Sequence, residues 1–503
     1  MLSKIKSASL VGITAIEITV EVDCHPGIPT EIIVGLPDMV IKESKSRIKS
    51  AIKHSALKYP HHVFTINLAP AEIKKEGPSF DLPIALGILN ATKQVKVPSD
   101  VLFVGELSLN GDLRPVRGIV SIADMAAKQG ISSLFVPQEN AAEAALIPGL
   151  EIIPVTSLLE VIAILEGEKP RLAVQSTPIL KNVSGPDFLD VKGQLSAKRA
   201  LEVAAAGNHN VLFVGPPGSG KTMLLKRLPS ILPDLTHDQA IESYKIRSVA
   251  QRVSRPTLSL ERPFRNPHYS ISYAGLIGGG SNPMPGEISL AHHGVLFLDE
   301  LPEFQRQVIE VLRQPLEEKT VTISRANAAV TYPANVLFAA AMNPCPCGYH
   351  RDSAQRCLCR PEQIQKYWKK LSGPILDRID IILEVPRLKK DDYFSVNPDS
   401  DPFASHAIKT RVETARTLQY SRYQANRSNA DMTPKDIRQF CELTTENKAL
   451  LENAIDKGLL SGRSFDRVLK LARTIADLAG ASNIEKNHLL EALQYRKRSQ
   501  QDG

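Results

Sequence analysis

The stretch Gly215-Pro-Pro-Gly-Ser-Gly-Lys-Thr222 decides the fold class of this chain. It follows an apolar run at 211–214 and precedes a helical run at 223–228. A loop of this form between a strand and a helix cradles nucleotide phosphates, because its backbone N–H groups and the helix N-terminus point at them. We expect Lys221 to reach the β- and γ-phosphates and the Thr222 hydroxyl to hold Mg²⁺. The predicted phosphate-binding residues are Gly215, Pro216, Pro217, Gly218, Ser219, Gly220, Lys221 and Thr222.

A second apolar run, at 295–298, ends in the two acids Asp299 and Glu300. In a phosphate-loop enzyme, an aspartate at this position completes the magnesium shell through water, and we expect the glutamate to polarise the attacking water. A glycine-rich turn plus an ordinary core strand would leave Lys221 unexplained. The two motifs together therefore predict binding and hydrolysis of ATP with Mg²⁺.

Strands and helices alternate around these motifs. Apolar strands are expected at 211–214, 295–298, 336–341 and 379–384, with helices between them. The alternation predicts an α/β fold, in which a parallel sheet is covered on both faces and the site lies at the carboxyl ends of the strands.

Length and composition bound the remaining possibilities. The chain has 503 residues, which suits about three domains. A net charge of +7 is compatible with nucleic acid as a partner and equally with a slightly basic enzyme. No stretch approaches the ~20 apolar residues of a membrane span, and the N-terminus lacks a signal-peptide pattern. We therefore expect a cytoplasmic protein with no membrane partner.

Two polar, proline-containing stretches divide the chain into three blocks. We expect a first domain at 1–168, a linker at 169–186, an ATPase core at 187–388, a second linker at 389–403, a helical domain at 404–496 and a tail at 497–503.

Three further polar residues are candidates for catalysis. Asn343 follows a predicted strand and can orient water beside Glu300, or it simply ends the strand in an Asn-Pro turn. Arg378 can stabilise charge on the transferred phosphoryl group, and doing so from a neighbouring subunit requires an oligomer. The alternative is a surface pair with the preceding aspartate. Arg463 opens a helix and is the first candidate to touch the γ-phosphate, with Arg467 as the second.

A cluster of four cysteines has the spacing C-x-C-x₉-C-x-C. Four thiolates so close together suit tetrahedral zinc, with His350 as a substitute ligand. Two disulfides, which a reducing cytosol disfavours, and four unbound thiols remain as alternatives. The predicted zinc ligands are Cys345, Cys347, Cys357 and Cys359.

Two basic features are candidates for contact with DNA. Residues 320–332 alternate about a polar tip and predict a β-hairpin, on which Arg325 can contact a phosphate or remain a solvated turn residue. A basic stripe on a predicted helix either follows a phosphate backbone or is a solvated face. The stripe consists of Lys42, Lys45, Lys49 and Lys53.

Four segments carry a family resemblance: Arg262–His268, Gly275–Gly280, Pro285–Gly294 and Asn343–Gly348. They resemble the AAA+ clade of magnesium-chelatase ATPase subunits and MCM helicases. Over essentially its whole length, the chain resembles the ComM/YifB magnesium chelatase-like family. The resemblance implies a hexameric ATPase that drives branch migration of DNA in natural transformation and recombination. It also places Asn343 as sensor 1 and Arg325 on a hairpin that enters a central channel. Arg463 is expected as sensor 2 on the same subunit as Lys221, and Arg378 as the arginine finger of the neighbouring subunit.

The N-terminal block resembles the proteolytic domain of Lon at residues 75–83 and 105–118. Ser79 matches the serine of Lon-type sites, but Val120 stands where those sites have lysine. A serine needs a base to be activated at neutral pH, and valine cannot serve. We therefore expect a Lon-protease-like α+β fold (ribosomal S5 domain 2-like) without peptidase activity.

These observations predict an ATP-driven, ring-shaped homo-hexamer acting on branched or single-stranded DNA. The main alternative is a protein-remodelling AAA+ ATPase of the magnesium-chelatase type. A nucleotide-binding scaffold and an ATP-dependent protease are disfavoured, because the catalytic positions are filled by competent residues and Val120 replaces the lysine. DNA-stimulated hydrolysis separates the first reading from the others.

Overall fold

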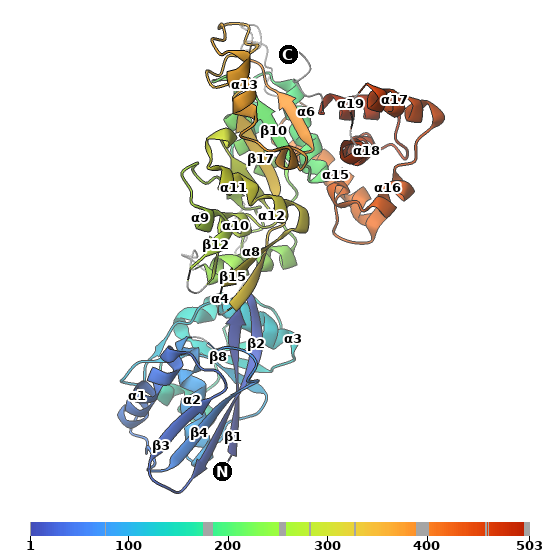
Figure 1. Cartoon of the computed structure of the whole chain (residues 1–503). Helices are drawn as coiled ribbons and strands as arrows, with labels where there is room; N and C mark the ends of the chain where they lie inside the picture. The colour runs from blue at the N-terminus through green and yellow to red at the C-terminus, as the bar shows by residue number, and fades with distance from the viewer. Residues whose placement is uncertain are drawn as a thin grey trace. The chain divides into compact units, whose positions relative to one another are not determined.

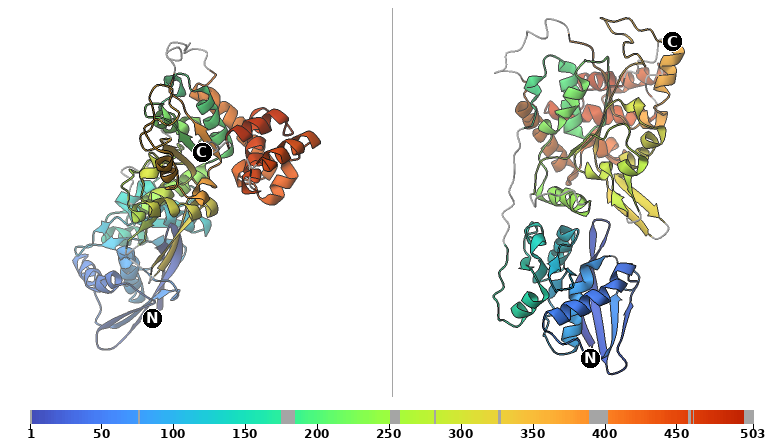
Figure 2. Two further views of the ribbon diagram at one scale, coloured as in Figure 1. Left: turned by 45° about the horizontal axis from the view of Figure 1, so that its top comes forward. Right: turned by 90° about the vertical axis from the view of Figure 1, so that its left-hand side faces the viewer.

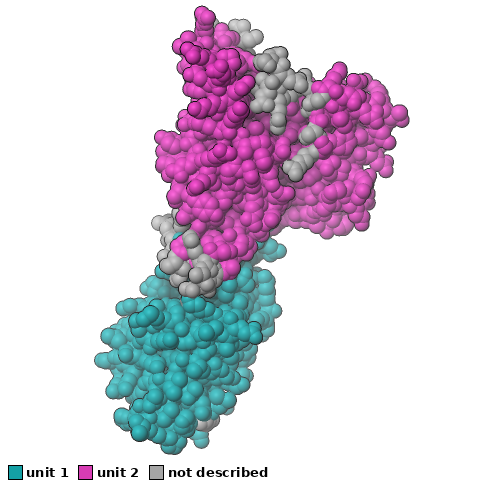
Figure 3. Space-filling model, in the orientation of Figure 1, with its two compact units in different colours: residues 1–181, 237–259 teal, residues 182–236, 260–503 magenta. Residues whose placement is uncertain are grey.

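The computed structural model describes residues 2–75, 77–174, 185–250, 258–280, 283–325, 328–388, 402–457, 460 and 462–496. Contacts divide the chain into two units, Met1–Lys181 with His237–Ser259, and Asn182–Thr236 with Leu260–Gly503 (Figure 3). Most of the predicted linkers at 169–186 and 389–403, and all of the predicted tail, lie outside the described residues. The predicted domain boundaries stay predictions.

The first unit is built on a mixed seven-stranded sheet of order β3-β4-β2-β1-β5-β8-β9 (Figure 1). Strands β1, β2 and β4 pair antiparallel, and the other neighbours pair parallel. A two-residue turn joins β1 to β2, and Gly12 adopts there the positive φ of 64° that such turns favour. The strands are β1 (Leu2–Val11), β2 (Thr14–His25), β3 (Thr30–Val34), β4 (Val63–Ala69), β5 (Val101–Phe103), β8 (Ser133–Pro137) and β9 (Glu151–Val155).

Helix α2 (Asp81–Ala91) is apolar on nearly every side and packs on β1 and β2 as the centre of this unit's core. It comes so close to the sheet that a Cβ on Gly87 would lie 2.6 Å from Val22 Cγ2. The other main helices of the unit are α1 (Met39–His54), α3 (Ile119–Lys128), α5 (Leu158–Leu165) and α8 (His237–Val249). Although α8 falls inside the predicted range 187–388, it belongs to the first unit.

The second unit contains a five-stranded sheet of order β11-β14-β17-β10-β18, in which every pairing is parallel. The three central strands are buried along their whole length, which agrees with their continuous apolar sequences. The four strands predicted from the sequence are confirmed. The strands are β10 (Val211–Val214), β11 (Phe264–Arg265), β14 (Val295–Leu298), β17 (Leu337–Met342) and β18 (Ile381–Glu384).

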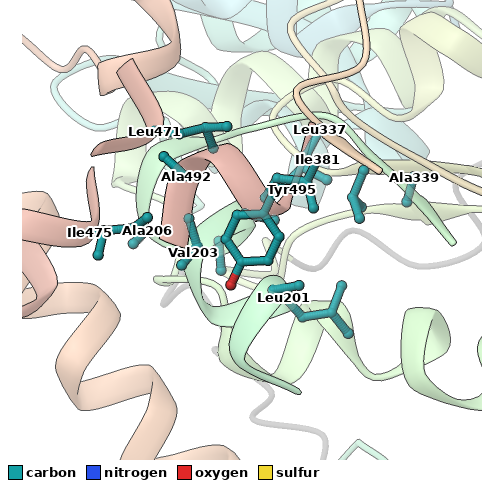
Figure 4. Close-up of a cluster of buried hydrophobic side chains, with 14 of the residues drawn as sticks. Leu201, Val203, Ala206, Leu337, Ala339, Ile381, Leu471, Ile475, Ala492 and Tyr495 are labelled. Atoms are coloured by element: carbon teal, nitrogen blue, oxygen red, sulfur yellow. The ribbon is translucent and has the colours of Figure 1, made fainter. Parts of the chain in front are cut away.

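The described residues of the C-terminal part of the second unit include five α-helices (Figure 1). Helices α15 and α18 pack on α6 (Leu195–Gly207), which also contacts β18. Apolar side chains from all these elements meet in one buried cluster. Figure 4 shows part of this cluster, including Leu201 of α6, Ile381 of β18 and Leu471 of α18. The five helices are α15 (Ser405–Tyr423), α16 (Pro434–Phe440), α17 (Thr445–Asp456), α18 (Gly462–Leu478) and α19 (Lys486–Gln494).

The predicted hairpin is confirmed as β15 (Thr320–Arg325) and β16 (Ala328–Pro333), which pair antiparallel from Thr320 with Pro333 to Arg325 with Ala328. Figure 2 shows this hairpin projecting from the body of the second unit. Among the described residues, no helix combines the length and the apolar composition that a bilayer span requires.

Candidate nucleotide-binding site

The phosphate loop leaves β10 and enters α7 (Lys221–Lys226). Gly218 and Gly220 have φ angles of 78° and 89°, so the loop's turns use the left-handed region that glycine tolerates. A Cβ on Gly215 would lie 2.2 Å from Val385 O, beyond the end of β18. The glycines are therefore required by turn geometry and by close packing, as the motif predicted.

Lys221 is largely buried, and its Nζ donates hydrogen bonds to Gly215 O at 2.7 Å and Pro216 O at 2.9 Å. Asn343 Oδ1 lies 3.5 Å from the same nitrogen. Burial lowers the pKa of Lys221 to about 8, while the nearby carboxylates of Asp299 and Glu300 oppose that shift. The ammonium group is thus held in the loop, at the place where it can meet phosphate oxygens.

The two acids lie directly beyond β14, next to the start of α7. Thr222 Oγ1 donates a hydrogen bond to Asp299 Oδ2 at 2.8 Å. Glu300 has a left-handed backbone with a φ of 51°, and its side chain is exposed. Hydroxyl and carboxylate oxygens are the ligands that Mg²⁺ prefers, so Thr222 and Asp299 fit this ion.

The structure thus brings together the predicted residues Lys221, Thr222, Asp299 and Asn343, with Glu300 beside Asp299. Each follows the carboxyl end of a strand in the same parallel sheet. This edge is where the crevice of an open parallel sheet binds its ligand.

Sequence reasoning missed Gln194, which precedes α6 with a left-handed φ of 54°. Its Nε2 donates to Ser219 O at 3.1 Å and to Pro386 O at 2.7 Å. The side chain ties the phosphate loop to the segment after β18. The only sequence signal was Gly193-Gln194 before an apolar helix, which is common at helix starts.

Arg378 lies at the opposite, amino edge of the sheet. Asn210 immediately precedes β10, and its Nδ2 donates to Arg378 O at 2.8 Å. The guanidinium donates to Arg313 O at 3.0 Å and Pro374 O at 2.8 Å, and it pairs with Glu317. Since the phosphate loop follows the carboxyl end of β10, Arg378 is directed away from its own chain's loop.

A polar cavity of about 550 Å³ opens at this amino edge. Arg378 and Arg467 both line it, and Arg467 Nη1 lies 3.3 Å from Asp380 Oδ1, just before β18. Arg463 lies one turn earlier on α18, and its side chain falls outside the described part of the chain. The first turns of α18 therefore lie at the same edge as Arg378, and the role of Arg463 stays a prediction.

The four predicted zinc ligands come together between β17 and α13 (Pro361–Trp368). Their sulfurs all lie within 4.8 Å of one another. Cys345 Sγ is 3.4 Å from Cys347 Sγ and 3.7 Å from Cys357 Sγ, and the last two are 3.6 Å apart. Tetrahedral zinc with Zn–S bonds of about 2.3 Å separates its sulfurs by about 3.8 Å. The cluster is thus compatible with zinc.

One thiol of the cluster is prepared for ionisation. Burial raises the pKa of Cys347, but backbone N–H groups of Tyr349 and Leu358 and the thiols of Cys345 and Cys359 outweigh burial and lower it to about 6. A thiolate is the form of cysteine that binds a metal.

The candidate DNA contacts lie apart from the phosphate loop in the sequence. On α1, Lys42, Lys49 and Lys53 are exposed, whereas Lys45 is half-buried and donates to Glu31 O at 2.5 Å. Lys49 also lies over the Tyr59 ring, 5.4 Å from its centre. Two lysines of the stripe, Lys45 and Lys49, therefore make local contacts, and Lys42 and Lys53 are exposed.

Three other residues singled out in the sequence are placed as follows. Arg325 ends β15, and its side chain lies outside the described part of the chain. Val120 is fully buried in α3, while Ser79 is half-buried in the turn before α2. Valine at this position offers Ser79 no base.

A phosphate loop and an acidic strand end in one parallel sheet, followed by a helical region, define an ATPase of the AAA+ type. Three family models match the chain: "Magnesium chelatase, subunit ChlI" at residues 187–393, "Subunit ChlI of Mg-chelatase" at 20–140 and "Magnesium chelatase, subunit ChlI C-terminal" at 403–496.

Similar proteins cover nearly the whole chain. The uncharacterized protein YifB of Escherichia coli is 43% identical over 98% of this chain and 97% of its own length. The competence protein ComM of Haemophilus influenzae is also 43% identical, with the same shares. The chain therefore belongs to the magnesium chelatase-like family of ComM and YifB. Residues of the chain also match Lon protease 1 of Hydrogenovibrio crunogenus at 28% identity, over 32% of this chain and 20% of that protein.

Proposed function

We propose that this ATPase is a ring-shaped homo-oligomer, a hexamer, that uses ATP hydrolysis to move DNA. The observation that carries the oligomer is the separation of the site's parts. The phosphate loop and Arg378 lie at opposite edges of one sheet, so one chain does not bring them together. In a head-to-tail ring, the amino edge of one subunit can face the carboxyl edge of the next.

Hydrolysis would then take place between subunits. Lys221 and the backbone of the loop bind the β- and γ-phosphates, and Thr222 and Asp299 hold Mg²⁺. Mg²⁺ neutralises charge on the phosphates when it is bound. Glu300 takes up a proton from the attacking water, and Asn343 orients that water. Arg378 of the neighbouring subunit stabilises charge on the transferred phosphoryl group.

Sensor 2 is proposed to be Arg463, as the family resemblance implies. Because α18 begins beside the cavity that Arg378 lines, we place Arg463 with the arginine finger on the neighbouring subunit rather than on the subunit that binds ATP. This revises the expectation that Arg463 acts within its own chain.

DNA is proposed as the substrate on three grounds. The hairpin β15–β16 carries Arg325 at its end, α1 presents a basic stripe, and the net charge is +7. Such contacts with phosphates do not depend on base sequence. The relative ComM is named as a competence protein. The role we propose is branch migration of DNA in recombination or natural transformation. We propose that the protein acts in the cytoplasm.

Two further assignments belong to this proposal. The four-cysteine cluster holds structural zinc, since all four ligands are then used and no position is open for catalysis. The first unit has a Lon-protease-like fold without peptidase activity, because the buried Val120 cannot activate Ser79.

The match to magnesium-chelatase family models favours one alternative, a protein-remodelling ATPase. The test is the rate of ATP hydrolysis by the full chain with branched, single-stranded and duplex DNA, with Lys221→Ala as the blank. Strong stimulation, greatest with branched DNA, supports the DNA motor. Rapid hydrolysis that no DNA stimulates supports protein remodelling instead.

A further inference from the structure

The segment that contains the four cysteines also touches the phosphate loop. Gly348 lies between the two cysteine pairs with a φ of 85°, and its N–H donates to Cys345 O at 3.0 Å. A Cβ on Gly348 would lie 2.8 Å from Pro217 Cδ and 2.9 Å from its Cγ. The turn that begins at Cys345 therefore rests directly on the second proline of the phosphate loop.

The same segment carries Asn343, whose Oδ1 lies 3.5 Å from Lys221 Nζ. Pro344 comes next, and its carbonyl accepts a hydrogen bond from Trp368 Nε1 at 3.0 Å. Asn343, which contacts the lysine of the nucleotide site, is thus only two residues before Cys345, which carries the first sulfur of the cluster.

The four sulfurs converge on one point of the segment. Cys345, Cys347 and Cys357 have sulfurs 3.4 to 3.7 Å apart, and all four sulfurs lie within 4.8 Å of one another. Four thiolates this close together repel one another unless a cation lies between them. No sulfur pair is joined as a disulfide.

From these contacts we infer that Cys345, Cys347, Cys357 and Cys359 bind one Zn²⁺, and that zinc loading sets the nucleotide affinity of the phosphate loop through Gly348 and Pro217. Binding turns the four thiols into thiolates and releases their protons to solvent. The inference rests on the proposed function in two respects, that ATP binds at this loop and that the cysteine cluster holds zinc.

Other contacts limit what zinc loss should change. Arg387, beyond β18, pairs with Asp352 at 2.8 Å and lies over the Tyr349 ring. These contacts hold the outer part of the segment without metal. The expected effect of zinc loss is therefore a loosened turn against Pro217, and the fold of the second unit is expected to persist.

The experiment uses the full chain, loaded with Zn²⁺ and freed of excess metal. Metal analysis is expected to find one zinc per chain in the wild type and in a Cys24→Ser control, and none in the double variant Cys357→Ser with Cys359→Ser. A fluorescent ATP analogue is expected to bind the double variant about tenfold more weakly. Trp368 is the single tryptophan of the chain, so its fluorescence should change when a chelator removes zinc.

Gly348→Ala tests the coupling without touching a ligand. It should keep its zinc and still bind the ATP analogue more weakly, because the added methyl group meets Pro217. A wild type that takes up no zinc would overturn the metal site. Unchanged nucleotide affinity in both the zinc-free variant and Gly348→Ala would overturn the coupling. If the wild type binds zinc but no ATP analogue, the proposed function itself fails, and metal content with Trp368 fluorescence still decides the metal site.

Discussion

Thr222 Oγ1 donates a hydrogen bond to Asp299 Oδ2 at 2.8 Å, although the two residues are 77 positions apart in the sequence. The bond joins the start of α7 to the end of β14. It places the hydroxyl and the carboxylate that would hold a magnesium ion next to each other. The parallel sheet therefore positions both proposed magnesium ligands at one edge.

We expect Glu300→Gln to bind ATP and to lose turnover by at least about a hundredfold, because the amide cannot accept a proton from water. Binding is measured with a fluorescent ATP analogue, and turnover by phosphate release. Lys221→Ala is the matched control and should fail to bind. A Glu300→Gln enzyme with normal turnover would show that another group activates the water.

We expect Arg325→Ala to abolish stimulation of the ATPase by DNA while leaving hydrolysis without DNA unchanged. The hairpin projects from the body of its unit, and Arg325 is the last residue of its first strand. Arg325→Lys should keep most of the stimulation, because a phosphate contact depends on charge. Equal stimulation of the alanine variant and the wild type would remove the hairpin from the DNA path.

The ion pair between Asp380 and Arg467 joins β18 to α18, and Asp380 also accepts from Asn210 N at 3.0 Å. Burial alone would raise the pKa of Asp380, but His209, Arg467 and Asn210 lower it far below its usual range. Asp380→Asn should therefore lower the free energy of unfolding by about 3 kcal/mol at pH 7.

The pH dependence of that cost follows from the sign of the shift. A lowered pKa stabilises the folded state above the unfolded value of about 3.9, and the stabilisation is lost as the pH falls toward the folded value. Urea unfolding should thus show a large difference between wild type and Asp380→Asn at pH 7 and a smaller one below about pH 4. A difference that does not depend on pH would contradict the role of the charge.

The central strands and the site residues beside them were predictable from the sequence. Strands buried on both faces read as continuous apolar runs, so β10, β14 and β17 were recognisable, and the acids after β14 followed. Strand β11 has two residues and leaves no such signal.

Other features depend on contacts between distant segments. Helix α8 packs with the first unit, where Lys245 pairs with Asp124 at 2.5 Å and Ser248 donates to Glu143 at 2.5 Å. Nothing in the local sequence of α8 specifies these partners. The role of Gln194 likewise requires a left-handed backbone and the carbonyl of Pro386, 192 residues away.

The proposal that the nucleotide site is shared between subunits is tested most directly by mixing two inactive variants. Lys221→Ala lacks a working phosphate loop, and Arg378→Ala lacks the finger, so each alone should hydrolyse almost no ATP. In mixed rings, an intact loop from one variant meets an intact finger from the other at about a quarter of the interfaces, and the mixture should recover about that share of the wild-type rate. Different affinity tags on the two variants confirm that mixed rings form. Activity no higher than the sum of the separate variants, in rings shown to be mixed, would contradict a nucleotide site shared between subunits.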